Sequence, residues 1–183
     1  MESRSSTVGT SEMQQNEDQV NTPDRILGVD PSLSSTGYAL IERTARGPRL
    51  REAGVIRSSA DKSLAQRVCE IGMGIREILD EYSPNSLAIE QVYAMPENPL
   101  TTIKMAHVRG AILMLAAERE IPVIDYSPRQ IKKLLTGSGA AGKEQIQLAV
   151  QRELGLSKIL EPNDVADATA VALCQYYSLK FAA

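Results

Sequence analysis

Residues 25–31 read Arg-Ile-Leu-Gly-Val-Asp-Pro, a short apolar run that ends at a carboxylate and is stopped by a proline. This pattern predicts a buried β-strand with Asp30 at its end. Residues 32–37 contain three serines, a threonine and a glycine and predict a turn, and Thr36 to Glu42 and Arg51 to Arg57 predict two more strands. The chain therefore begins, in our interpretation, with an antiparallel meander.

Further along, the apolar pattern alternates between helical and extended periods. Apolar residues spaced alternately four and three positions apart predict a helix from Leu64 to Tyr82, and residues 86–90 predict a fourth strand that again ends at an acid, Glu90. The remaining predicted elements are a helix from Pro99 to Glu118, a strand from Pro122 to Asp125, and helices from Pro128 to Leu135, Lys143 to Leu154 and Asn163 to Leu179. This order predicts an α/β fold with a five-stranded mixed sheet flanked by helices, compatible with a ribonuclease H-like fold.

The composition excludes several classes of protein. The chain has 183 residues, 43% of them hydrophobic and 23% charged, which suits one globular domain over residues 25–183. Two cysteines and one histidine supply neither a disulfide framework nor a thiolate zinc site. Because no apolar run approaches the roughly 20 residues of a membrane span, and residues 1–24 lack a signal-peptide pattern, we expect a cytoplasmic protein with no membrane partner.

Residues 1–24 are polar and acidic, and we predict that they form a disordered tail. They hold five acids and one base, whereas the whole chain has a net charge of −3, so residues 25–183 carry +1. The charge balance therefore neither supports nor excludes a nucleic-acid partner.

Four acids stand out. Asp30 and Glu90 end apolar strands, where open α/β sheets collect ligands, although such a residue is also commonly just the first solvated position. Asp164 and Asp167 lie three residues apart at the start of an apolar helix, where ordinary first-turn acids are the alternative. Taken together, four carboxylates suit two Mg²⁺ ions that activate water and stabilise a leaving oxygen in phosphodiester cleavage.

Three other side chains have binding chemistry. Lys132 and Lys143 flank a Gly-rich turn at residues 136–142 and could meet phosphates or remain solvated. Tyr93 follows the strand that ends at Glu90, and its ring suits either base stacking or the edge of the core.

The helix predicted from Pro99 to Glu118 presents small and apolar residues on one face, and we expect this face to pack in the core; it consists of Ile103, Ala106, Gly110, Leu113 and Ala117. Gly110 on that face also permits close approach of a second helix in a dimer. We predict buried positions for Cys69 and Cys174 and a surface or interface position for His107.

These motifs, in this order, resemble the RuvC family of Holliday-junction resolvases over residues 25–177. The matching segments are residues 26–31, Thr36-Gly37-Tyr38, residues 88–93, Arg109-Gly110, Arg129-Gln130, residues 139–143 and residues 164–168.

The resemblance implies a ribonuclease H-like homodimer that makes paired, Mg²⁺-dependent nicks in four-way DNA junctions during recombination and repair, with Mn²⁺ as a substitute metal. It places the family's catalytic, metal-binding acids at Asp30, Glu90, Asp164 and Asp167. It also implies junction contacts by Lys132, Lys143 and Tyr93, and the RuvA–RuvB branch-migration complex as partner. The chain departs from the family at Ser32, where glycine is common, and in its acidic tail.

Two other functions compete with a two-metal endonuclease. An actin- or sugar-kinase-type phosphotransferase also begins with a strand, an acid and a Thr-Gly turn, but this chain is short for two lobes. A non-catalytic junction-binding protein would keep the fold, although the presence of all four acids disfavours it.

Overall fold

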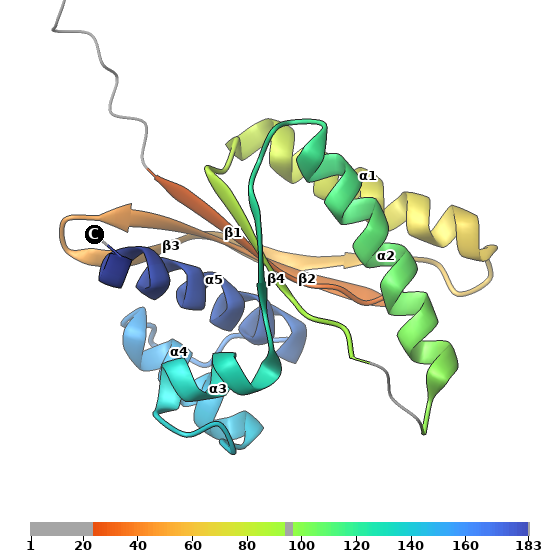
Figure 1. Cartoon of the computed structure of the whole chain (residues 1–183). Coiled ribbons are helices and arrows are strands. Elements are labelled where there is room, and N and C mark those ends of the chain that lie inside the picture. Colours follow the sequence, from red (N-terminus) through yellow and green to blue (C-terminus); the bar gives the residue numbers. More distant parts are fainter. Residues whose placement is uncertain (1–23, 94–96, 183) are drawn as a thin grey trace, which may run out of the picture.

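A computed structural model describes residues 24–93 and 97–182 (Figure 1). The strands of its single sheet are β1 (Arg25–Asp30), β2 (Ser35–Thr44), β3 (Gly47–Arg57), β4 (Ser86–Glu90) and β5 (Val123–Tyr126). Their order is β3-β2-β1-β4-β5; β1, β2 and β3 pair antiparallel, whereas β4 pairs parallel with β1 and β5. The predicted meander and the five-stranded mixed sheet are confirmed.

The described helices are α1 (Leu64–Tyr82), α2 (Pro99–Ala117), α3 (Pro128–Thr136), α4 (Lys143–Glu153) and α5 (Asn163–Ala182). Side-chain caps set three of their starts, because Ser63, Asn98 and Ser127 accept hydrogen bonds from the third residues of α1, α2 and α3. The predicted elements all exist, and their bounds differ by a few residues. The largest difference is β3, which begins at Gly47 rather than at Arg51.

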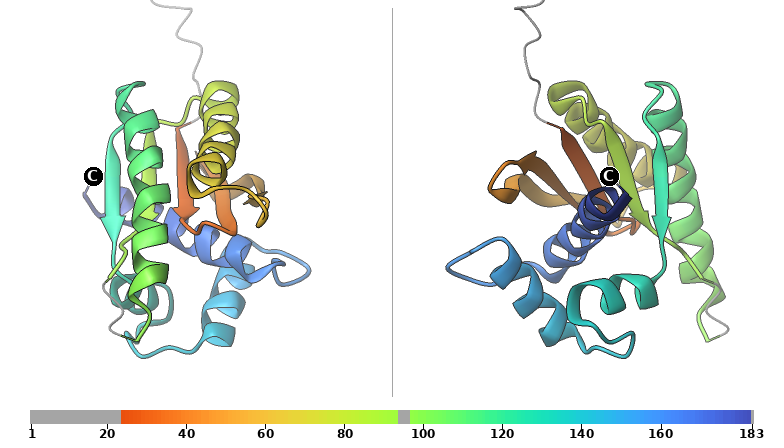
Figure 2. Two further views of the ribbon diagram at one scale, coloured as in Figure 1. Left: turned by 90° about the vertical axis from the view of Figure 1, so that its right-hand side faces the viewer. Right: turned by 60° about the vertical axis from the view of Figure 1, so that its left-hand side comes forward.

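The helices cover the two faces of the sheet separately (Figure 2). Along β1 the side chains alternate in the manner of a strand: Ile26 packs in one core with α3, α4 and α5, and Leu27 and Val29 pack in a second core with α1 and α2. By the same alternation, Asp30 and Glu90 lie on the α5 face, since Ile26 and Ala88 belong to that core. The sheet therefore directs both strand-end acids toward α5.

Two glycines let α5 approach the sheet at backbone distance. A Cβ atom on Gly28 would lie 2.3 Å from the carbonyl oxygen of Ala168, and one on Gly37 would lie 2.0 Å from that of Asp164. Gly37 is also the register partner of Asp30 on the neighbouring strand. The start of α5 is thus fixed against the end of β1, which brings Asp164 beside Asp30.

The prediction for the packed face of α2 is wrong. The side chains that α2 buries are those of Val108, Ile112, Leu115 and Ala116. The face predicted to lie in the core is instead largely exposed, including Ile103, Ala106, Gly110 and Ala117. The helix is apolar around most of its circumference, so its sequence period does not select the buried side.

Among the described helices, α2 is long and apolar enough to cross a membrane by length and composition alone, with a mean hydropathy of 1.2 and 22% of that window buried. By this criterion of length and composition, the expectation that no apolar segment approaches the length of a membrane span is wrong. A helix of the core of a soluble protein passes the same criterion, and α2 packs on α1.

Three smaller predictions have mixed outcomes. Cys174 is buried as predicted, whereas Cys69 is exposed, contrary to prediction. His107 is on the surface, as predicted. The prediction of a tail over residues 1–24 lies outside the described residues except for Asp24, whose carboxylate pairs with Arg43 at 2.8 Å.

Candidate metal and nucleic-acid site

Three elements supply the four predicted acids. Asp30 ends β1, Glu90 ends β4, and Asp164 and Asp167 occupy the first turn and a half of α5. The two strands are adjacent and parallel, so their carboxyl ends lie at the same edge of the sheet. We call these four side chains the acid cluster. The structure brings all four sequence-predicted acids to one edge.

The electrostatics of the acid cluster reflect this proximity. Burial, and then the charges of Asp167 and Asp164, raise the pKa of Asp30 to about 7. Burial, and then the charges of Asp30 and Asp167, raise the pKa of Glu90 to about 7. A fully solvated strand-end acid would show neither effect, so burial and the neighbouring acids disfavour the ordinary alternative for these two residues.

Two lysines oppose this negative charge. Lys143, the first residue of α4, lies with its Nζ 3.3 Å from Oδ2 of Asp167. Its charge lowers the pKa of Asp30, and together with Lys132 it lowers that of Glu90, although burial outweighs both. Lys132 on α3 and Lys143 therefore face the acid cluster; the predicted contact of both lysines with phosphate stays a prediction.

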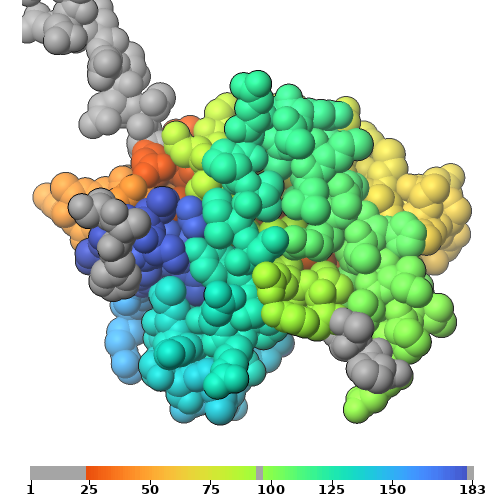
Figure 3. All heavy atoms as spheres, in the orientation of Figure 1, coloured from red at the N-terminus to blue at the C-terminus, as the bar shows by residue number. Residues whose placement is uncertain are grey.

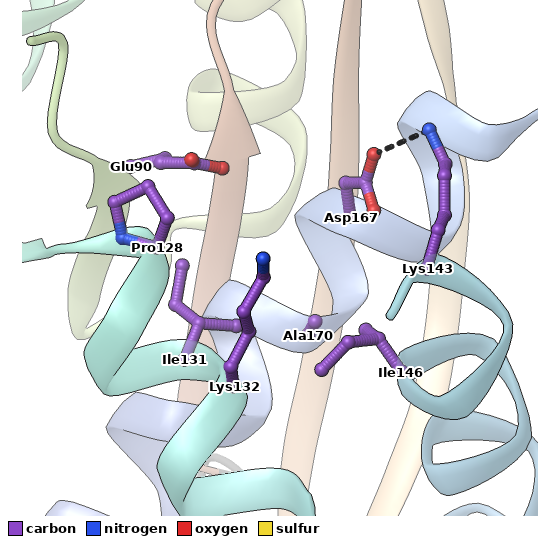
Figure 4. A pocket seen from close by; sticks show the side chains of 8 residues that line it. All are labelled: Glu90, Pro128, Ile131, Lys132, Lys143, Ile146, Asp167 and Ala170. Atoms are coloured by element: carbon purple, nitrogen blue, oxygen red, sulfur yellow. Dashed lines mark ion pairs between the residues drawn. The ribbon is translucent and has the colours of Figure 1, made fainter. Parts of the chain in front are cut away.

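A cleft of about 290 Å³ opens over this edge of the sheet. Figure 4 shows its lining, in which the ammonium ends of Lys132 and Lys143 point into the space beside Glu90 and Asp167. The floor is apolar and is made by Ile131, Ile146 and Ala170. Acids and lysines that line the same cleft suit an anionic ligand held beside bound cations.

A second hollow, of about 150 Å³, adjoins the first on the other side of Glu90. Asp30, Glu90 and Tyr93 are among the residues that line it. The side chain of Tyr93 is 53% exposed, and its hydroxyl donates a hydrogen bond to the side chain of Gln91 at 2.6 Å. The ring is therefore accessible to a ligand, and base stacking by Tyr93 stays a prediction beside the core-edge alternative.

The donor atoms of the site fit a hard divalent cation. Carboxylate oxygens are the ligands that Mg²⁺ and Mn²⁺ prefer. The thiol of Cys174 is fully buried, and burial and then the charge of Glu90 raise its pKa to about 12. His107 lies exposed on α2, where its Nδ1 contacts the carbonyl oxygen of Ile103.

Within residues 24–93 and 97–182, no three His, Cys, Asp or Glu side chains are arranged to hold one ion as they stand. Like charges repel in the metal-free acid cluster, and Asp167 is engaged by Lys143.

The loop after Asp30 does not depend on the glycine that is common in the resembled family. The backbone N–H of Ser32 donates to Oγ1 of Thr36, which in turn donates to the carbonyl oxygen of Ser32. Ser32 is absent from the positive-φ residues of the described chain. Serine therefore closes this turn without strain.

Sequence analysis gave no role to two residues that shape the site. Gly37 allows the approach of Asp164, and its signal was the Thr-Gly pair at the start of β2. Arg109 on α2 donates to the carbonyl oxygen of Glu90 at 3.1 Å. In the sequence, only the Arg109-Gly110 segment that matches the RuvC family pointed to this residue.

Comparison with known proteins gives a consistent result. A protein family described as "Crossover junction endodeoxyribonuclease RuvC" matches residues 26–175. A protein of that name from Rhodopirellula baltica is 47% identical over 154 residues, which cover 83% of this chain and 85% of the relative.

Solved structures agree. The structure of Thermus thermophilus RuvC has a TM-score of 0.78 and 30% identity, covering 86% of this chain and 96% of that one. The same protein in complex with a Holliday junction substrate gives a TM-score of 0.79 and 31% identity, with the same coverage.

Proposed function

The chain belongs to the RuvC family of crossover junction endodeoxyribonucleases, and from that membership we propose that it cuts four-way DNA junctions by paired, symmetric nicks in recombination and repair. The observation that carries the proposal is the acid cluster itself. Four carboxylates from β1, β4 and α5 meet at one edge of the sheet, and two of them have pKa values raised to about 7. Such crowding destabilises the metal-free protein and suits cations bound during phosphodiester hydrolysis.

Asp30 and Glu90 would hold one Mg²⁺ ion, and Asp164 and Asp167 would complete the site for a second, with Mn²⁺ able to substitute. Bound there, the ions would supply an activated water and charge stabilisation on the leaving oxygen. The protein's own contribution is to fix the carboxylates on rigid elements and to keep them partly out of water. The non-catalytic alternative is disfavoured, because a protein that only binds DNA has no use for the repulsion between these acids.

Lys132 and Lys143 would bind phosphate oxygens. Both ammonium groups face the cleft (Figure 4), and Lys143 would exchange its contact with Asp167 for phosphate once cations neutralise that acid. Tyr93 would stack on an unpaired base near the junction centre, because its ring is exposed beside the acid cluster.

We also propose that the active form is a homodimer through α2. The residues Leu100, Ile103, His107, Gly110, Met114 and Ala117, which we call the α2 stripe, recur alternately three and four positions apart and are exposed. The side chains of Leu100, Ile103 and Met114 are 66%, 51% and 54% exposed. A Cβ on Gly110 would meet nothing within 4 Å, so a second helix has room to approach.

Figure 3 shows α2 as a broad part of the surface with no other element over it. A second copy seated there would place two acid clusters about a twofold axis, which matches the symmetry of a four-way junction. We propose a cytoplasmic location, with the α2 stripe facing that second copy rather than a membrane, and the RuvA–RuvB complex as partner.

The test of the dimer compares two exposed methionines. Met114→Glu should give monomers in analytical ultracentrifugation, because it places a charge in the α2 stripe. Met73→Glu on α1, where the side chain is 56% exposed, should leave the dimer intact. Dimers in both variants would show that the contact lies elsewhere, and capture of either form by lipid vesicles would favour a membrane instead.

The test of the activity is nicking of a labelled, mobile four-way junction with Mg²⁺, beside linear duplex of the same sequence. Symmetric cuts confined to the junction support the proposal. Tight junction binding without cuts under Mg²⁺ or Mn²⁺ would favour a non-catalytic binding protein. ATP hydrolysis without DNA cleavage would favour a phosphotransferase.

A further inference from the structure

Arg109 joins three elements at the edge of the acid cluster. Its Nη1 donates to the backbone carbonyl oxygen of Glu90 at 3.1 Å, and its Nη2 pairs with the carboxylate of Asp125. The guanidinium thus ties α2 to the end of β4 and to β5. The Arg109 side chain is 17% exposed and that of Asp125 is 44% exposed, so the bond to the Glu90 carbonyl is partly buried whereas the ion pair with Asp125 is open to solvent.

The position of Glu90 depends on its backbone. Throughout the described ranges, no side chain donates a hydrogen bond to the Glu90 carboxylate, and the strand ends at this residue. On the β5 side, the N–H of Gln91 donates to the carbonyl oxygen of Tyr126 at 2.9 Å. Arg109 adds a charge-assisted bond to the carbonyl of Glu90 itself, from the opposite layer of the molecule.

We propose that Arg109 is a positioning residue for metal binding: it fixes the end of β4 so that the Glu90 carboxylate meets Asp30 at the shared metal. This inference rests on the proposed function, since it assigns Arg109 a role only at a metal site. The bidentate fork suits the task, because one nitrogen holds the carbonyl while the other is oriented by Asp125. Lysine at this position would satisfy one partner at a time.

An ordinary structural ion pair is the competing interpretation, and the chain offers a matched example. Arg119, just beyond the C-terminal end of α2, is 22% exposed, pairs with Asp80 at 2.7 Å, lies 3.7 Å from the carboxylate of Glu118 and donates to the carbonyl oxygen of Leu115 at 2.9 Å. The two arginines therefore have the same partners in kind. Only the carbonyl that Arg109 holds belongs to the acid cluster.

The experiment measures metal binding separately from cleavage. Purified full-length protein is titrated with Mn²⁺ alone, and free Mn²⁺ is followed by electron paramagnetic resonance. The variants are Arg109→Gln, Arg109→Lys and Arg119→Gln. The Mg²⁺ concentration for half-maximal junction nicking, junction affinity without metal, and the melting temperature are measured on the same preparations.

We expect Arg109→Gln to weaken Mn²⁺ binding about tenfold, the usual effect of removing a group that orients a metal ligand. The Mg²⁺ requirement for nicking should rise by a similar factor, while junction affinity without metal stays unchanged. Arg109→Lys should fall between Arg109→Gln and the wild type. Arg119→Gln should lower the melting temperature but bind Mn²⁺ as the wild type does.

Wild-type Mn²⁺ binding in Arg109→Gln would overturn the inference and leave Arg109 as an ordinary ion pair. If Arg109→Gln does not fold, Arg109→Lys decides, since it keeps the charge and loses only the fork. A wild-type protein that neither binds Mn²⁺ nor nicks junctions would instead contradict the proposed function, so the two failures are distinguishable.

Discussion

The two ends of β1 differ in the charges that surround them. At its start, Nε of Arg25 lies 3.4 Å from the carboxylate of Glu42, and Nη1 donates to the carbonyl oxygen of Tyr82 at 2.8 Å. At its end, Asp30 meets the like charges of Asp164 and Asp167 in a partly buried setting. Opposite charges pair at one end of the strand, and like charges gather at the other.

The difference separates charges that serve the fold from charges that serve the chemistry. The pair at the start of β1 offsets the cost of burying either group. Without metal, the acid cluster lowers the free energy of unfolding, because folding places these carboxylates where their ionised forms are disfavoured. Such a cost is expected where a site is organised for a ligand that brings the missing positive charge.

The largest effect should come from removing one charge at each end. Asp30→Asn should reduce junction nicking about a thousandfold, the equivalent of the several kcal/mol that a bound metal contributes. The same change should raise the melting temperature of the metal-free protein, because it relieves repulsion. Gel-based nicking assays and thermal melts in EDTA measure the two effects.

Glu42→Gln is the matched change at the other end. It should leave nicking intact and lower stability by about 1 kcal/mol, since Arg25 loses its counter-charge. A lower melting temperature in Asp30→Asn, or a loss of nicking in Glu42→Gln, would contradict the distinction between charges that serve the chemistry and charges that serve the fold.

The next largest effect on nicking should come from the close contact between Gly37 and the backbone of α5. Gly37→Ala should reduce nicking about a hundredfold, because the new Cβ would lie 2.0 Å from the Asp164 carbonyl oxygen and would push the start of α5 away. Gly47→Ala changes the first residue of β3, where φ is +121° and the new Cβ would meet nothing within 4 Å. It should cost roughly 1–3 kcal/mol of strain in denaturant titrations and leave the nicking rate of the folded protein unchanged.

The acid cluster should also control stability against pH. Asp30 and Glu90 have pKa values of about 7 in the folded, metal-free protein, whereas unfolded carboxyl groups titrate near pH 4. Between about pH 4 and pH 7 the folded state therefore binds more protons than the unfolded state, so stability should fall as pH rises through this window. Melting temperatures in EDTA should show this fall.

Saturating Mg²⁺ should reduce that dependence and raise the melting temperature most above pH 7, because cations bind the ionised carboxylates. Asp30→Asn should show a shallower fall in EDTA. A flat or rising profile for the wild type in EDTA would contradict the account of the acid cluster.

The smallest effect concerns the lysines that face the cleft. Lys143→Ala and Lys132→Ala should each weaken junction binding at all sequences and reduce the salt slope of affinity by about one. Lys62→Ala is the control, because Lys62 is exposed and pairs with Glu70 away from the cleft. Equal slopes in all three variants would mean that these lysines do not contact phosphate.

Much of the site could be predicted because its signals are local. An apolar run that ends in an acid identifies both a strand and its terminal side chain, as at Asp30 and Glu90. The start of β3 was less accessible, because residues 47–50 form an edge strand through backbone pairing with β2 and have little apolar alternation. The buried face of α2 was predicted wrongly. Because this helix is apolar around most of its circumference, its residue pattern does not indicate which face is buried.

Contacts between distant segments could not be predicted from residue patterns. The approach of Gly37 to Asp164 and the bond from Arg109 to the Glu90 carbonyl both depend on how layers pack. The sequence contained these residues in short motifs, but only the fold shows what they touch.

The most direct test of the account is to locate metal in the protein. Crystals grown with Mn²⁺ should show two anomalous-scattering peaks about 4 Å apart at the edge of the sheet. Asp30, Glu90, Asp164 and Asp167 should surround them, and the occupancy should be lost in Asp30→Asn. Ordered Mn²⁺ elsewhere on the chain, with none between these carboxylates at saturating concentration, would contradict the central claim.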